Sequence, residues 1–329
     1  RRVLARRKTS WNIGKSSIPI ALHIKSLMKK ISLLLALLFS TAAVAQQTTD
    51  ISEFEITSEG LIGVALRMSP IATDRPDITE SAQITPVGWL QYEGGYQFGH
   101  SEELMPGGAI TDAHQIEEVL RFGINRRFEV RAVINANTER IDHPSTWNDP
   151  MRRTGVSPVT FGFKYNLIRE SDVLPQTTWL SHISNSWISA GDYASVYPKQ
   201  IFHEQRLMLE KTLTSRLGIA SNIGVAGGLN GSEGLFNEGM FSLALGYDLG
   251  HNYGVYVEYF SEWYFAGTQF SATPYFDGGF TRLLSNDLQL DIYAGFDLSQ
   301  YTNSAKQTKR LFFGTGVSYR LPLAAHLKQ

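Results

Sequence analysis

The sequence predicts an all-β fold, a closed antiparallel transmembrane β-barrel of about twelve strands. Three observations predict it: apolar and polar residues alternate along one segment after another, the connections between segments are alternately long and short, and a secretion signal precedes them all. Alternation with a period of two gives each strand one apolar and one polar face, whereas a helix, with its period of 3.6 residues, would mix the two sets.

The first 45 residues are expected to precede the folded chain. Lys29 and Lys30 follow Met28, residues 31–39 are apolar, and Ala43-Val44-Ala45 fits a signal-peptidase site, so residues 28–45 are predicted to be a signal peptide. The apolar run is far shorter than the ~20 residues that a membrane-spanning helix needs. Residues 1–27 begin without a methionine; we interpret them as translated upstream sequence, with a genuine basic extension as the alternative.

Composition excludes several kinds of chemistry. The 329 residues include no cysteine, which removes disulfides, thiolate metal sites and cysteine nucleophiles. Residues 1–45 hold nine basic and no acidic residues, so the remainder carries 21 basic and 31 acidic residues, a net charge of −10. A strongly acidic exported chain is a poor partner for nucleic acid.

Residues 46–86 form a polar N-terminal arm without a sustained period. The arm contains the run TDRPDITES at residues 73–81, where charged and hydroxyl side chains surround a proline. One interpretation is a solvated arm. The other is a segment inserted into a polar cavity and held there by the charged residues of this box, whose candidate site residues are Asp74, Arg75, Pro76, Asp77 and Glu80.

The barrel is predicted over residues 87–321, with residues 322–329 as a C-terminal tail. Each segment has roughly the 9–11 residues, or slightly more, that a tilted strand needs to cross hydrocarbon. The expected strands are residues 87–98, 114–124, 127–138, 154–168, 173–186, 200–213, 217–229, 238–249, 253–264, 269–283, 287–298 and 309–321.

The last two of these strands show the pattern most clearly. Leu288, Leu290 and Ile292 alternate with polar residues such as Gln289 and Asp291, and residues 309–321 repeat the alternation. The same pattern suits a β-sandwich, in which apolar faces pack on each other. The export signal, the aromatic residues that flank the apolar faces, and the charges of both signs on the polar faces favour a barrel in lipid. An open sheet edge would leave backbone groups unsatisfied in hydrocarbon, so the sheet must close.

The polar faces are therefore predicted to line a wet lumen and to bind or pass small solutes. The candidate lumen and substrate-binding residues are Glu93, Glu117, Arg121, Glu129, Arg131, Lys164, Glu204, Arg206, Glu258, Asp291 and Arg310.

The box at residues 73–81 and the residues after it resemble a known family. That family, of the MetA pathway of phenol degradation, opens with a TDRPD-x-TES box, followed by Pro-x-Gly and a first strand of the type L-Q-x-E. The matching residues are Thr73, Asp74, Arg75, Pro76, Asp77, Thr79, Glu80, Ser81, Pro86, Gly88, Leu90, Gln91 and Glu93, and residues 117–131 are also similar. The resemblance implies a channel or transporter in the bacterial outer membrane, for hydrophobic or aromatic compounds. The chain departs from common barrel sequences where it continues past Tyr319.

One motif suggests an enzyme instead. His182-Ile183-Ser184-Asn185 has the H-x-S-N spacing of outer-membrane phospholipase A and of lipid A deacylases. On a strand His182 and Ser184 share a face, so the imidazole could deprotonate the hydroxyl, given an acidic or amide residue on a neighbouring strand and a face turned to lipid. A lipid hydrolase is thus the alternative function. The simpler interpretation is that His182 and Ser184 are polar residues of the lumen or the membrane interface on a barrel strand. A third possibility is a structural or adhesive barrel.

The sequence predicts neither a metal site nor a cofactor, because the eight histidines are scattered and no cluster has ligand spacing. The main expectation is a protein without enzymatic activity. The expected partners are outer-membrane lipid, a small-molecule solute and, during biogenesis, the barrel-assembly machinery. No nucleic acid is expected to bind.

Overall fold

The computed structural model describes residues 69–76, 78–143, 149–197, 199–228, 237–266, 269–299 and 308–323. The predicted upstream extension and signal peptide, most of the arm, Asp77 and nearly all of the C-terminal tail lie outside this part of the chain.

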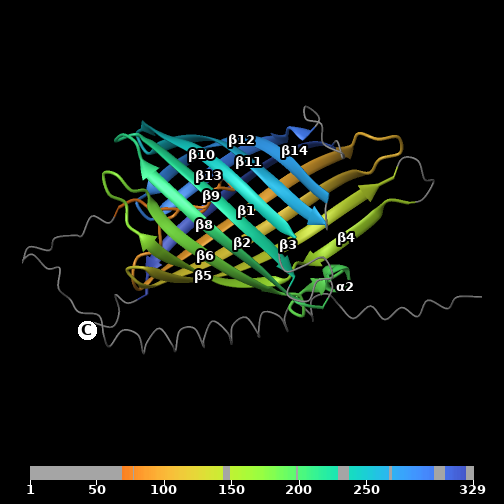
Figure 1. Cartoon of the computed structure of the whole chain (residues 1–329), viewed down its shortest axis with the longest axis horizontal. Coiled ribbons are helices and arrows are strands. Elements are labelled where there is room, and N and C mark those ends of the chain that lie inside the picture. Colours follow the sequence, from red (N-terminus) through yellow and green to blue (C-terminus); the bar gives the residue numbers. More distant parts are fainter. Residues whose placement is uncertain are drawn as a thin grey trace, which may run out of the picture. The chain divides into compact units, whose positions relative to one another are not determined.

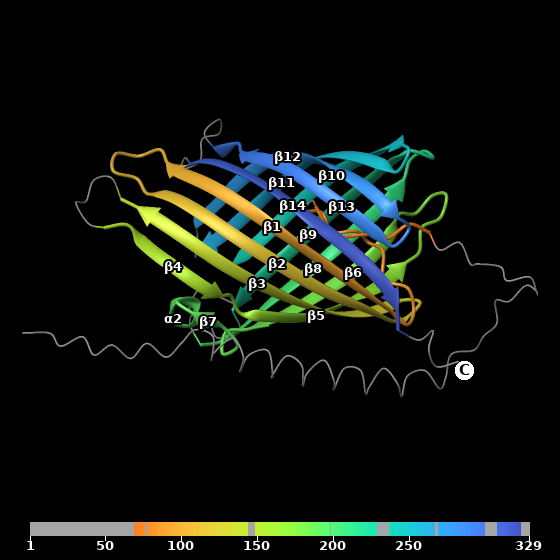
Figure 2. The same cartoon turned by 180° about the vertical axis from the view of Figure 1, so that it is seen from behind.

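The described residues form a ring of antiparallel strands (Figures 1 and 2). Fourteen strands belong to the sheet; β4 and β7 lie outside the ring, and the other twelve close it, as predicted. The ring strands are β1 (Trp89–Glu103), β2 (Ile110–Asn125), β3 (Phe128–Asp142), β5 (Val159–Ile168), β6 (Gln176–Asn185), β8 (Ile201–Thr212), β9 (Leu217–Gly228), β10 (Glu238–Gly250), β11 (Tyr253–Ala266), β12 (Gln269–Ser285), β13 (Leu288–Asp297) and β14 (Thr308–Pro322).

Closure is made by the first and last strands. β1 pairs with β14 along its whole length, from Trp89 opposite Pro322 to Glu103 opposite Thr308. β2 and β3 pair as well, so the ring has no open edge. Every strand of the ring therefore has a hydrogen-bonded neighbour on both sides, which is the condition for crossing hydrocarbon.

The two faces of the ring differ as the alternation predicts. On β13, Ile292 is 57% exposed on the outside, while Asp291 is 2% exposed on the inside. Phe280 and Phe313 are similarly exposed on neighbouring strands. Apolar side chains thus cover the outside of a closed ring and charged ones fill its inside, which excludes the sandwich. Such an outer surface is stable only in contact with lipid.

The bounds of several strands differ from the prediction, and the largest differences are in β4, β1 and β2. The strand expected at residues 154–168 is two pieces, β4 (Met151–Val156) and β5, which pair with different stretches of β3. Pro158 lies between them and has no backbone N–H for the ladder. β1 and β2 also run further than expected, with Ser101 opposite Thr111. Pairing continues there through polar residues, whose sequence carries no alternation because both faces meet water.

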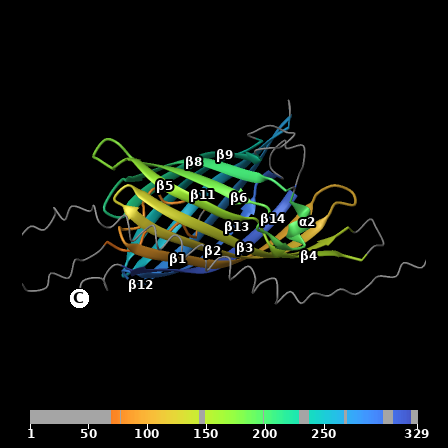
Figure 3. The ribbon, with the colours of Figure 1, turned by 90° about the horizontal axis from the view of Figure 1, so that it is seen from below.

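The longest connections gather at one end of the ring, which also holds the two-residue connection between β11 and β12, and the turns at the other end have two to seven residues. A small structure at the long-loop end contains β4, β7 (Ala190–Gly191) and the short helix α2 (Tyr193–Val196), and β4 projects beyond the ring there (Figure 3). At the other end, β2 and β3 are joined by Arg126 and Arg127 alone. Among the described residues, no helix is long and apolar enough to cross a membrane.

Candidate functional site

Residues 69–76 and 78–86 lie inside the ring and form a plug, a name used below for these residues. The plug begins and ends at the short-turn end: the Ile71 N–H donates to the Asn286 carbonyl (2.7 Å), and the Thr85 N–H donates to Glu129 Oε2 (2.6 Å). Between these points it reaches Glu258 on β11, which accepts a bond from the Ile78 N–H at 2.8 Å. Its orange trace is visible within the barrel, toward the short-turn end, in Figure 2. The described part of the arm is therefore inserted into the polar lumen, as the second interpretation of the sequence expected, and is not a solvated arm.

Asp74 is the most enclosed charge of the plug. Its Oδ1 lies 2.6 Å from Lys164 Nζ on β5, and its Oδ2 lies 3.0 Å from Arg131 on β3 and 3.2 Å from Arg121 on β2. The Asp74 N–H also donates to Glu93 Oε2 (2.9 Å). Three strands thus direct cations at one carboxylate, which is how a buried charge is kept from costing several kcal/mol.

Glu80 makes a second set of ion pairs beside the first. Its Oε2 lies 2.5 Å from Arg131 and 3.6 Å from Lys164, while its Oε1 lies 3.2 Å from Arg206 on β8. Arg206 also pairs with Glu204 of the wall, and Glu204 Oε2 is 3.0 Å from His182 Nδ1. Opposite charges therefore follow one another from β3 to β8, linked through the plug.

Arg75 extends to the opposite wall. Its guanidinium lies 3.4 Å from Asp291 Oδ1 on β13 and 5.9 Å from the ring centre of Tyr293. Gly95 on β1 and Gly316 on β14 leave the space for it, since a Cβ at Gly95 would lie 2.1 Å from Arg75 Cζ. Glycine at these two positions allows the guanidinium to lie close to the barrel backbone.

Glu258 holds the innermost turn of the plug. Its carboxylate accepts bonds from the Ile78 N–H and from the Thr79 N–H (2.7 Å), and the Thr79 hydroxyl is in contact with it too. Thr79 Oγ1 also lies 2.7 Å from Ser242 Oγ on β10. Backbone donors that would otherwise be unpaired in the lumen are thereby satisfied.

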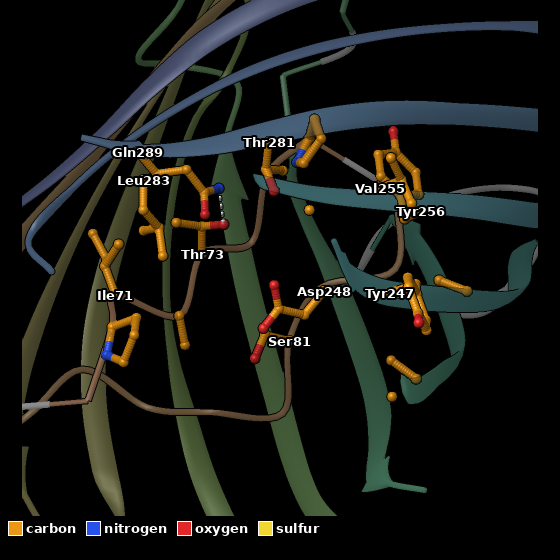
Figure 4. Close-up of a pocket in the computed structure, with 18 of the residues that line it drawn as sticks. Ile71, Thr73, Ser81, Tyr247, Asp248, Val255, Tyr256, Thr281, Leu283 and Gln289 are labelled. Atoms are coloured by element: carbon orange, nitrogen blue, oxygen red, sulfur yellow. Dashed lines mark hydrogen bonds between the residues drawn. The ribbon is translucent and has the colours of Figure 1, made fainter. Parts of the chain in front are cut away.

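A cavity lies on each side of this turn. The first, about 590 Å³, lies at the short-turn end between the plug and β8–β12; Thr79 lines it, as do Ile71, Thr73 and Gln289 (Figure 4). The Gln289 amide donates to Thr73 Oγ1 (2.9 Å). The second, about 570 Å³, is lined by Ile78, Arg206 and residues of β9–β12. The plug stands between the two.

The remaining predicted residues are placed as follows. Glu117 is half-buried opposite Gly95, and the Arg310 guanidinium donates to the Tyr275 hydroxyl (3.4 Å), away from the plug. Pro76 lines the short-turn cavity, and Asp77 lies outside the described residues.

Several wall residues that bind the plug are absent from the residues predicted from the sequence, among them Glu210 on β8, Gln176 on β6 and Ser242 on β10. Glu210 Oε2 accepts bonds from the Ser81 hydroxyl and the Ala82 N–H, both at 2.9 Å. It shares the inward face of β8 with Glu204 and Arg206 and lies four positions beyond Arg206, so the period of two could have found it.

The H-x-S-N motif faces the lumen. His182 is 7% exposed, Ser184 Oγ lies 2.6 Å from Thr160 Oγ1, and Leu180 on the same face packs against Ala82 of the plug. The acidic neighbour that catalysis would need exists in Glu204, but the pair is turned away from acyl chains. The condition of a lipid-facing serine is therefore not met. No group of three or more metal-ligating side chains is gathered for a metal ion in the part of the chain that the structure describes.

Fold and lumen together define a transmembrane β-barrel of the bacterial outer-membrane type, and comparisons with solved structures agree. The COG4313 outer membrane channel from Pseudomonas putida F1 is similar at a TM-score of 0.57 and 10% identity, over 75% of this chain and 99% of that one. The translocator domain of the autotransporter NalP from Neisseria meningitidis is more distant, with a TM-score of 0.48 and 9% identity over 72% of this chain and 90% of that one. The Pseudomonas putida toluene transporter TodX has a TM-score of 0.39 and 8% identity, also over 72% of this chain and 90% of that one. At these identities the likeness concerns the fold alone.

No family model and no curated protein matches the sequence.

Proposed function

We propose that the protein is an outer-membrane channel for small solutes whose lumen is closed by its own N-terminal segment. One observation carries the proposal: a closed ring encloses a charged lumen, and the plug is held between two cavities of comparable volume by ion pairs to both walls. A segment held by separate polar contacts, without continuous strand pairing, can leave while the ring stays intact.

Hydrophobic or aromatic compounds are the proposed solutes. Phe260, Tyr275 and Phe312 form a buried aromatic cluster on β11, β12 and β14, with the rings of Phe260 and Tyr275 stacked at 4.5 Å. Phe260 also lines the cavity on the long-loop side, as does Tyr264 on the same face of β11. An aromatic lining of this kind suits flat apolar solutes. The resemblance of residues 73–81 to the phenol-degradation family supports the same class.

The proposal is tested by removing the plug. Deletion of residues 46–81 removes Asp74, Arg75 and Glu80 with the turn at Glu258, so the single-channel conductance in planar bilayers should rise several-fold. Deletion of residues 46–68 keeps the described plug and serves as the control, with conductance like that of the whole chain. If the whole chain and both deletion variants had the same conductance, the plug would not close the lumen.

Two further assays separate the rival functions. Swelling of liposomes with a panel of sugars, amino acids and aromatic acids should rank the solutes that pass, and a structural or adhesive barrel would pass none even without the plug. Phospholipase activity of the purified protein should be absent with or without Ser184→Ala. Activity that the substitution abolishes would favour the hydrolase.

A further inference from the structure

Two cations of the wall, Arg131 and Lys164, form their ion pairs with the plug, although Glu129 of the wall lies opposite Lys164 in the ladder of β3 and β5. Arg121 has carboxylate partners on its own wall, Glu93 at 2.8 Å and Glu129 at 2.9 Å. The carboxylates that form ion pairs with Arg131 and Lys164 among the described residues are those of the plug. Both cations are buried, at 5% and 0% exposure, and a buried charge deprived of its partner is strongly unfavourable. When the plug leaves, another anion or water must take its place.

A buried imidazole adjoins the same place, and its Nε2 can accept a hydrogen bond there because its Nδ1–H is donated to Glu204. The ladder sets Arg131 opposite Gly162 and Gly162 opposite His182, so the three lie side by side across β3, β5 and β6. The His182 ring lies over Gly162, where a Cβ would come within 2.2 Å of it. His182 Nε2 is buried and has no hydrogen-bond partner in the described part of the chain, while Nδ1 is taken by Glu204.

A solute can approach this site from the long-loop side. Arg206 lines the cavity there, and it is in contact with Glu80, whose side chain is 14% exposed. Asp74 lies deeper, with 5% of its side chain exposed. An incoming acid would therefore meet Arg206 first, compete with Glu80, and then reach Arg131 and Lys164.

We infer that Arg131 and Lys164, with Arg206 beside them, form the binding site for an organic acid bearing two carboxylates, and that Asp74 and Glu80 occupy it in place of that acid. Both plug carboxylates contact the same Arg131 nitrogen, so the acid groups of the ligand must lie a few bonds apart. The inference rests on the proposed channel function and narrows its solutes to acids. Because acid and plug exclude one another, binding of the acid releases the plug.

Release of the plug from the barrel wall can be followed with a single introduced cysteine, because the chain itself has none. Ala82 is fully buried in the docked plug, so the thiol of Ala82→Cys should react with a maleimide only when the plug leaves. At about ten times the dissociation constant of the acid for the emptied site, phthalate should speed labelling about tenfold. The dissociation constant is measured by calorimetry on the variant Asp74→Asn with Glu80→Gln. Phthalamide, which has the same shape without charge, should leave the rate unchanged.

Variants of the wall complete the test. On the Ala82→Cys background, Lys164→Gln should raise the basal labelling rate and abolish its dependence on phthalate. Lys211→Gln, on β8 with its carboxylate partner Glu170 in the β5–β6 turn, should leave both unchanged. Equal effects of phthalate and phthalamide, or no binding of phthalate to the Asp74→Asn, Glu80→Gln variant, would overturn the acid site. The channel function would still stand if the deletion of residues 46–81 raised conductance, and would fall separately if it did not.

Discussion

Arg75 illustrates how single residues connect the plug to the barrel. Its guanidinium reaches Asp291 through a space that exists because Gly95 and Gly316 have no side chains. Asp291 is 2% exposed, so displacing Arg75 leaves a buried carboxylate without that ion pair. Docking of the plug therefore depends on wall residues that carry no charge themselves.

Gly95→Ala tests this dependence. The three atoms nearest to the added methyl belong to the flexible end of Arg75, which it would displace. We expect docking to weaken by about 1–3 kcal/mol, the cost of leaving a buried polar group unsatisfied. More frequent openings in single-channel recordings would report it. The control is Gly99→Ala on the same strand and face, where a Cβ meets no heavy atom within 4 Å. Equal opening frequency in the two variants would contradict this role of Arg75.

At the scale of the strand, position along the barrel wall decides what a substitution costs. Ile292 lies midway along β13 and points outward, and Tyr319 points outward near the short-turn end of β14. A charge at the centre of the hydrocarbon loses its hydration, whereas one near the interface keeps much of it.

Ile292→Arg should consequently lower the free energy of unfolding by about 2–4 kcal/mol, and Tyr319→Arg by about 1 kcal/mol or less. Reversible urea unfolding in lipid vesicles, followed by tryptophan fluorescence, measures both. If the two substitutions cost the same, the outward face of β13 does not lie in the hydrocarbon core.

Over the whole molecule, closure of the barrel is independent of the plug. The ladders from β1 to β14 are made by the strands alone, and the plug adds side-chain bonds and short contacts at the rim. Without the plug, water can fill the lumen and hydrate Arg131 and Lys164. The deletion of residues 46–81 should therefore still give a folded barrel, seen as faster migration of unheated than of heated samples in SDS gels. A single unfolded band would instead make the plug a necessary part of the fold.

Much of this architecture could be predicted from the sequence. Twelve strands, their faces and closure in lipid followed from alternation, and the errors were at β4, where Pro158 divides a strand, and in the polar extensions of β1 and β2. The charged box at residues 73–81 indicated an inserted segment, but not which wall residues it meets. The period of two places Glu210 on the inward face of its strand, but no sequence pattern shows that the plug passes beside it.

The sequence by itself determined which side chains face lipid and which face the lumen, because in a strand that choice depends only on odd or even position. Tertiary structure alone decided the partners inside. Asp74 meets Lys164 across 90 residues and Arg75 meets Asp291 across 216. Residues so far apart in the sequence come into contact only when the register of every strand pair is fixed and the ring is complete. No local sequence pattern specifies all of these registers together.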